Sequence, residues 1–140
     1  MEINEQIDEI KKNLKLIGLL EKQFDMRPNP DVDEPLVYCG VAKTNLISEI
    51  TPIVEEQFGK PYKTAGDSAF FMNLFDKFIR KVGGIRTEQT LYRKDITDKV
   101  ILYCAFWPWG SEPVKTSIRI GLVCYDSKEE EFVKYLKSFF

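Results

Sequence analysis

Two apolar runs within residues 99–126 predict a β-hairpin around which the rest of the chain is arranged. Val100 to Trp107 is apolar or aromatic at every position, which is typical of a strand that is covered on both faces. From Ile118 to Tyr125 apolar positions alternate with others, which predicts a half-buried partner strand. Gly110 breaks the pattern between the two runs, so the sequence Trp107-Pro108-Trp109 is expected at the tip of the hairpin.

The N-terminal residues 2–24 carry a helical stripe of apolar side chains and predict a long amphipathic helix. The stripe has the narrow spacing of a coiled-coil seam and consists of Ile3, Ile7, Ile10, Leu14 and Ile17. Two interpretations stay open at this point. The stripe is either a dimerisation surface between two copies of the chain, or the face by which the helix packs on its own domain.

A broader apolar face predicts the central helix of the core over residues 68–82, with Asp67 or Ser68 as its N-cap. Gly83-Gly84 is expected to end this helix. The side chains that we expect to find in the interior are Phe70, Phe71, Leu74, Phe75, Phe78, Ile79 and Val82.

Two further helices are predicted on either side of this one. The first runs from Thr44 or Asn45 to Phe58, with an interruption at Pro52. The second is C-terminal and begins at Ser127, which forms a capping box with Glu130.

Residues 36–42 and 85–93 predict two additional strands, and residues 25–35, with three prolines and four acidic residues, predict a surface connector. We therefore expect one α+β domain over residues 1–140, made of the N-terminal helix, the connector and a core over residues 36–140. Its centre is an antiparallel meander of three or four strands packed on about three helices as a two-layer sandwich, in the order α-(β)-α-α-β-β-β-α.

Alternation assigns the central strand two faces, and the second of these is the candidate functional surface. Leu102 and Cys104 are expected to face the helices, whereas Tyr103 and Trp107 are expected on the opposite side. Extending this alternation to the neighbouring strands gives an aromatic and basic surface. Its candidate binding residues are Tyr92, Tyr103, Trp107, Trp109, Arg119 and Tyr125. Either this face is covered by the N-terminal helix or a second subunit, or it binds a ligand.

Composition narrows the chemistry that this surface can perform. The chain of 140 residues is 44% hydrophobic and 30% charged, as in globular proteins. It contains no histidine, which excludes Ser-His-Asp and Cys-His catalysis and histidine-bound metals. Cys104 and Cys124 are expected in the core, and Cys39 is the candidate for a reactive thiol. No pattern predicts a metal site or a cofactor, and the net charge of −2 argues against binding to nucleic acid or membranes.

Three functions fit these observations. The first is a cytoplasmic, non-enzymatic protein-interaction module (an adaptor, chaperone or regulator) that acts as a homodimer and uses the aromatic sheet face and the Trp-Pro-Trp tip. The second is a small-molecule-binding domain or enzyme with an aromatic pocket between the sheet and the helices. The third is a binder of single-stranded nucleic acid, in which aromatic residues beside arginine stack on bases.

Overall fold

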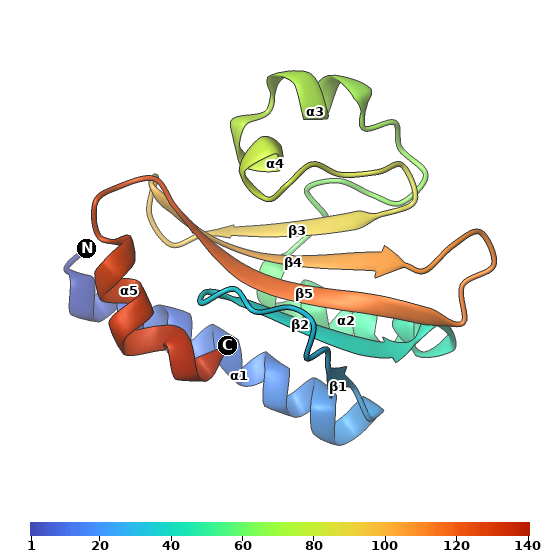
Figure 1. The fold of residues 1–140 in the computed structure, drawn as a ribbon, viewed down its shortest axis with the longest axis horizontal. Helices are drawn as coiled ribbons and strands as arrows, with labels where there is room; N and C mark the ends of the chain where they lie inside the picture. The colour runs from blue at the N-terminus through green and yellow to red at the C-terminus, as the bar shows by residue number, and fades with distance from the viewer.

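An antiparallel sheet of five strands is the centre of the fold, which a computed structural model describes for residues 1–140 (Figure 1). The strands lie in the order β1-β2-β5-β4-β3. Their bounds are β1 Arg27–Pro28, β2 Val37–Lys43, β3 Thr90–Asp95, β4 Val100–Pro108 and β5 Lys115–Cys124. The predicted α+β class is confirmed, and β4 does lie between β3 and β5. The connector contributes the short edge strand β1, which the sequence analysis did not predict.

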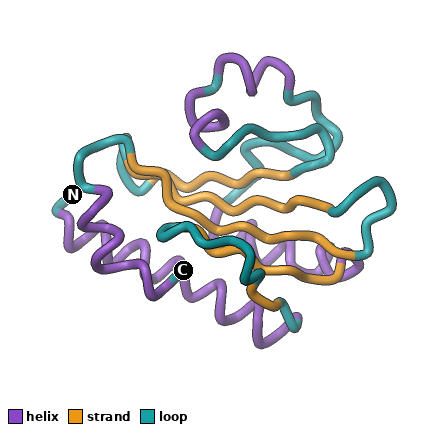
Figure 2. Tube along the Cα trace, in the orientation of Figure 1, coloured by secondary structure: helices purple, strands orange, loops and turns teal.

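Three helices cover one face of the sheet, here called the main face (Figures 1 and 2). They are α1 Ile3–Phe24, α2 Ile47–Phe58 and α5 Glu129–Leu136, with short 3-10 turns at Thr44–Leu46 and Lys137–Phe139. Val100, Leu102, Cys104 and Phe106 of β4 point into this core, as alternation predicted. The apolar stripe of α1 lies here too. Ile7, Ile10, Leu14 and Ile17 are buried in the chain's own core and Ile3 packs against it, so a dimer could not use this stripe without opening the domain.

The opposite face, here called the second face, is covered by the α3–α4 segment, residues 68–84, and not by the N-terminal helix (Figure 1). This segment contains α3 Phe70–Phe75 and α4 Lys77–Lys81. Phe78 and Ile79 of α4 pack on Ile101, Tyr103 and Val123 of the sheet. The fold therefore has a small third layer, which corrects the expectation of a two-layer sandwich.

The prediction of one continuous core helix over residues 68–82 is wrong. The chain breaks at Asp76, whose backbone is extended and whose Oδ1 accepts a hydrogen bond of 3.0 Å from Ile79 N. Asp76 is therefore the N-cap of a new helix, a role in which aspartate is strongly favoured. Because of this break, Phe78 and Ile79 are the only fully buried side chains of the seven predicted for the interior, and Val82 is partly buried. The other four, Phe70, Phe71, Leu74 and Phe75, are exposed.

The side chains of β3 show that one predicted site residue, Tyr92, lies on the wrong face of the sheet for a site on the second face. Tyr92 pairs with Cys104 and faces the main core, where its hydroxyl donates to Glu55 Oε2 of α2 at 2.7 Å. The residue that shares the second face with Tyr103 is Arg93, its register partner. Alternation along β3 does hold, with Leu91 on the second face and Tyr92 on the main face, but the prediction assigned the two sets of side chains to the opposite faces of the sheet.

The starts of the other helices also differ from the predicted caps. Neither Thr44 nor Asn45 caps α2, which begins at Ile47 and continues through Pro52. At the C-terminus, α5 begins at Glu129 without a capping box, and Asp126 Oδ1 accepts a hydrogen bond of 3.0 Å from Lys128 N at the turn before it.

Candidate functional site

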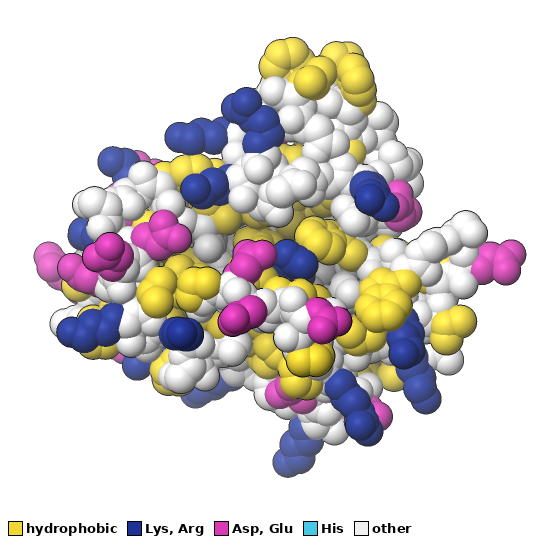
Figure 3. Space-filling model, viewed as in Figure 1, with side chains coloured by type: hydrophobic (Ala, Val, Ile, Leu, Met, Phe, Trp, Pro, Cys, Tyr) yellow, Lys and Arg dark blue, Asp and Glu magenta, His cyan; other side chains and the backbone are white.

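A pocket of about 350 Å³ lies on the second face between the connector and the end of α4. Tyr103 of β4 and Arg119 of β5 contribute to it from the sheet. The segments 34–37 and 81–83 line it on either side. Figure 3 shows this part of the surface hollowed, with hydrophobic side chains and a basic group inside the hollow. We call it the Arg119 pocket.

Arg119 is a mostly buried cation whose one ionic partner is distant. Its side chain is only 18% exposed, and its Nη1 lies 3.9 Å from Glu34 Oε1, which is the outer limit of an ion pair. The guanidinium carbon lies 4.4 Å from the centre of the Trp107 ring, so the cation stacks on the indole. Arg119 Nε and Trp107 Nε1 are both buried and have no hydrogen-bond partner. Buried donors are normally paired, so this cluster is short of acceptors.

Tyr103 lies across the neighbouring strand because Gly121 leaves room for it. The two residues are register partners, and a Cβ atom at position 121 would lie 2.5 Å from the tyrosine ring. Phe78 holds the ring from above, with the ring centres 6.2 Å apart. Burial raises the pKa of Tyr103 to about 12, although the nearby Arg119 acts against this rise. The hydroxyl is therefore neutral at physiological pH and can donate a hydrogen bond.

The hairpin tip separates its two tryptophans. Trp107 is half-buried beside Arg119, whereas Trp109 is 48% exposed. The Trp109 Nε1 donates to Ser117 Oγ at 2.7 Å, and the Lys115 ammonium lies 5.7 Å from the ring centre. The indole is thus held in place while about half of its surface stays open to solvent.

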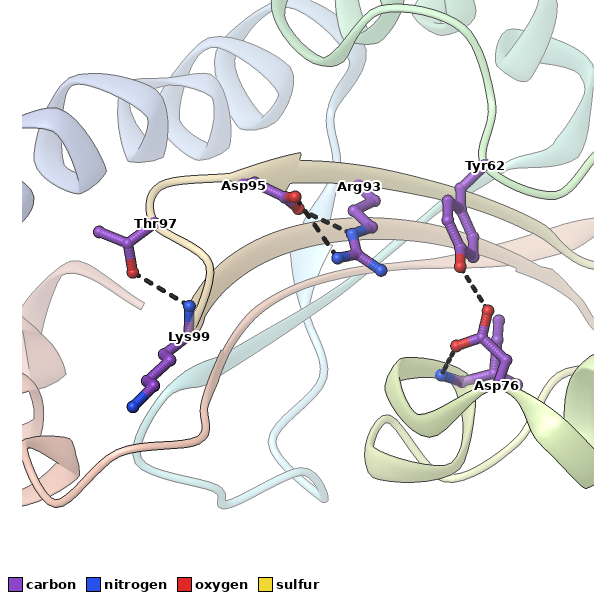
Figure 4. Close-up of polar contacts among 7 residues, drawn as sticks. Tyr62, Asp76, Arg93, Asp95, Thr97 and Lys99 are labelled. Carbon is purple, nitrogen blue, oxygen red and sulfur yellow. Dashed lines mark hydrogen bonds and ion pairs between the residues drawn. The ribbon is translucent and has the colours of Figure 1, made fainter.

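A second hollow, of about 560 Å³, opens on the other side of α4 and contains Tyr125. Here the Arg93 guanidinium lies 4.9 Å from the Phe78 ring and its Nε donates to Asp95 at 2.7 Å. The Tyr62 hydroxyl donates to Asp76, as Figure 4 shows. Arg93 is thus paired closely with a carboxylate, whereas the only carboxylate near Arg119 lies 3.9 Å away. The sequence analysis did not predict Arg93 as a site residue because it assigned the two faces of this strand the wrong way round.

Helix α3 presents its apolar side outward. Phe70 is 64% exposed, Phe71 70%, Leu74 50% and Phe75 76%. The polar residue Asn73 instead faces the protein, where its Nδ2 donates to Ile85 O at 2.7 Å and its Oδ1 accepts from Ile85 N at 2.8 Å. These paired hydrogen bonds fix the rotation of the helix. Figure 3 shows the resulting hydrophobic crest at the end of the molecule.

Lys63 is a buried cation with a structural role. Its Nζ donates to three backbone carbonyls of the turn before β3, those of Arg86 at 2.8 Å, Thr87 at 2.6 Å and Gln89 at 2.8 Å. Its backbone also exchanges hydrogen bonds with Leu91 at the outer edge of β3.

The cysteines do not form a reactive centre. Cys39, Cys104 and Cys124 are all buried and form no disulfide. The thiol of Cys39 is therefore not accessible to a reagent, contrary to the expectation that it is reactive. Cys124 reaches the Arg119 pocket, but its thiol donates to Asp126 Oδ1 at 2.9 Å, and burial raises its pKa to about 11. The thiol therefore stays protonated at neutral pH.

No group of three or more Cys, Asp or Glu side chains is placed to hold a metal ion. None of the helices combines the length and the apolarity needed to cross a bilayer.

The structure thus brings together three of the predicted binding residues, Tyr103, Trp107 and Arg119. Trp109 lies nearby at the tip, Tyr125 lies in the hollow beyond α4, and Tyr92 lies on the main face. Comparisons of this chain with protein-family models, with curated proteins and with solved structures find no match. Function must therefore be inferred from the geometry of the second face.

Proposed function

We propose that this protein is a non-enzymatic protein-interaction module that holds an acidic segment of its partner in the Arg119 pocket. The single observation that carries the proposal is the state of Arg119, whose mostly buried side chain is stacked on Trp107, is only loosely paired with Glu34 and has an Nε without a hydrogen-bond partner. A guanidinium in this state is preorganised to bind a carboxylate through two parallel hydrogen bonds.

The surroundings of Arg119 favour a peptide. Pro35, Leu36 and Val37 offer an apolar wall beside the cation, and the Tyr103 hydroxyl is a neutral donor. Trp109 projects from the hairpin tip and offers a rigid aromatic contact outside the pocket, where a longer ligand could reach it. The thiol of Cys124 is protonated, so it supplies no nucleophile to the pocket.

A small anionic molecule is the second candidate. The pocket volume of about 350 Å³ lies within the range of small-molecule sites. The same Arg119 would bind its carboxylate, so the two candidates differ in whether contacts outside the pocket contribute to affinity.

The test begins with selection of peptides from a random display library on the full-length protein. The affinity of the enriched peptide is then measured by fluorescence anisotropy for the wild type and for Arg119→Met and Arg93→Met. Arg93→Met is the matched control, because Arg93 also stacks on aromatic rings of the second face but already has Asp95 as its partner.

We expect enrichment of Asp and Glu, and a loss of affinity of about 30-fold or more in Arg119→Met, since removing one partner of a buried charge pair costs about 2 kcal/mol or more. Arg93→Met should change the affinity by less than about twofold. Peptides without acidic residues, or equal affinity in Arg119→Met, would contradict the proposal. A small aromatic carboxylate that binds as tightly as the peptide would favour the second candidate instead.

A further inference from the structure

We infer that the α3–α4 segment attaches the protein to an anionic membrane surface, with the α3 side chains inserting among the lipids and the surrounding basic residues contacting their headgroups. This inference concerns a different surface from the Arg119 pocket and does not depend on it.

The apolar part of this surface is the outward side of α3. Phe70, Phe71, Leu74 and Phe75 are 50–76% exposed, and the rings of Phe71 and Phe75 are stacked with their centres 6.4 Å apart. At the usual size of these side chains they expose roughly 500 Å² of apolar surface. A patch of this size on a monomer is often functional, but it is below the ~800 Å² that each partner contributes to a standard protein interface.

The orientation of α3 shows that this exposure is held in place by the fold. Asn73 faces inward and is clamped to the backbone of Ile85 by two hydrogen bonds. Turning the apolar residues inward would break both hydrogen bonds and bury the amide without partners. The four apolar side chains are thereby kept at the outer end of the molecule, where Figures 1 and 3 place α3 and a hydrophobic crest.

The charged part of the surface lies on α4 and in the segments that flank α3 and α4. Residues 60–86 contain six basic side chains but only two acidic ones, a local excess of positive charge in a chain whose net charge is −2. The acidic residues are Asp67 and Asp76, and Asp76 is already engaged by Tyr62 and by the start of α4. The basic residues are Lys60, Lys63, Lys77, Arg80, Lys81 and Arg86, of which all but Lys63 are exposed.

Local charge decides attraction to a surface, because salt screens the acidic remainder of the chain beyond about 10 Å. The net charge, which argued against membrane binding at the level of sequence, therefore does not describe this segment. An apolar crest of Phe and Leu beside exposed lysine and arginine is the pattern of a protein that lies on an anionic bilayer. The four crest side chains carry no hydrogen-bonding group, as insertion among acyl chains requires.

The experiment is co-sedimentation of the full-length protein with vesicles of phosphatidylcholine alone and with about 30 mol % phosphatidylglycerol. Two variants remove the two parts of the surface: Phe71→Ser with Phe75→Ser, and Lys77→Glu with Arg80→Glu. Their matched controls are Val114→Ser, which changes an apolar side chain that is 77% exposed at the hairpin loop, and Lys12→Glu with Lys15→Glu on α1.

We expect the wild type to bind the anionic vesicles and to bind phosphatidylcholine vesicles far more weakly. Each test variant should lower binding to anionic vesicles by about tenfold or more, while both controls bind like the wild type. The changed side chains are exposed, so unchanged circular dichroism melting should show that the variants are folded.

Three results would overturn the inference. The first is a wild type that stays in the supernatant with anionic vesicles, and the second is test variants that bind as well as the controls. The third is self-association that needs α3, seen by sedimentation equilibrium without any vesicle binding, which would make the crest a protein interface. None of these results bears on peptide binding by Arg119, so the two proposals fail separately.

Discussion

The two faces of the sheet are built differently although they share the same strands. The main face has a core of 25 buried residues under three helices, and the second face has only nine under the α3–α4 segment. On the second face, cations lie against aromatic rings, as Arg119 does on Trp107 and Lys77 on Tyr125. We infer from this difference that the main face supplies most of the folding stability. The second face can therefore carry unpaired hydrogen-bond donors and exposed aromatic side chains.

The largest expected effect compares neighbouring residues of β4 that point to opposite faces. Leu102 on the main face and Ile101 on the second face are both almost completely buried. Leu102→Ala should lower the free energy of unfolding by about 4 kcal/mol and Ile101→Ala by about 2 kcal/mol, because the smaller layer can settle into the cavity. Urea unfolding of both variants measures the difference. An equal or greater loss in Ile101→Ala would show that the second face is as rigidly packed as the main face.

A smaller loss of folding stability is expected when the buried cation Lys63 is removed. Lys63→Met leaves the three carbonyl groups of residues 86, 87 and 89 without their donor and should cost about 3 kcal/mol. Lys60→Met, which changes an exposed lysine in the same stretch, should stay within about 0.5 kcal/mol of the wild type. The same urea unfolding measurement checks both. If Lys63→Met were as stable as Lys60→Met, the turn before β3 would not depend on this cation.

The parts of the fold that could be predicted from the sequence follow from a regular spacing of apolar side chains. The helix α1, the hairpin of β4 and β5 and the two faces of β4 all rest on long runs in which every side chain position is constrained by burial. The grouping of Tyr103, Trp107 and Arg119 followed from these runs, since alternation fixes which side chains share a face.

The parts that could not be predicted depend on single polar side-chain contacts. Asp76 caps α4 and divides a run whose apolar spacing is that of one helix. Asn73 is hydrogen-bonded to Ile85, which turns the apolar side of α3 outward, and Lys63 donates to the carbonyls of residues 86, 87 and 89. Periodicity carries no information on such contacts. It also favoured the wrong face for Tyr92, whose hydroxyl is satisfied by Glu55 inside the main core.

We infer that the α3–α4 segment is a separate layer, of lower local stability, on a sheet that the main face stabilises. Native-state hydrogen exchange tests it directly by comparing the amides of Val82 and Gly84, which bond to Phe78 and Ile79, with those of residues 10–20 in α1. We predict that the Val82 and Gly84 amides exchange through local opening at a free energy about 2 kcal/mol or more below that of α1, which should exchange only on global unfolding. Equal free energies in both elements would contradict the claim.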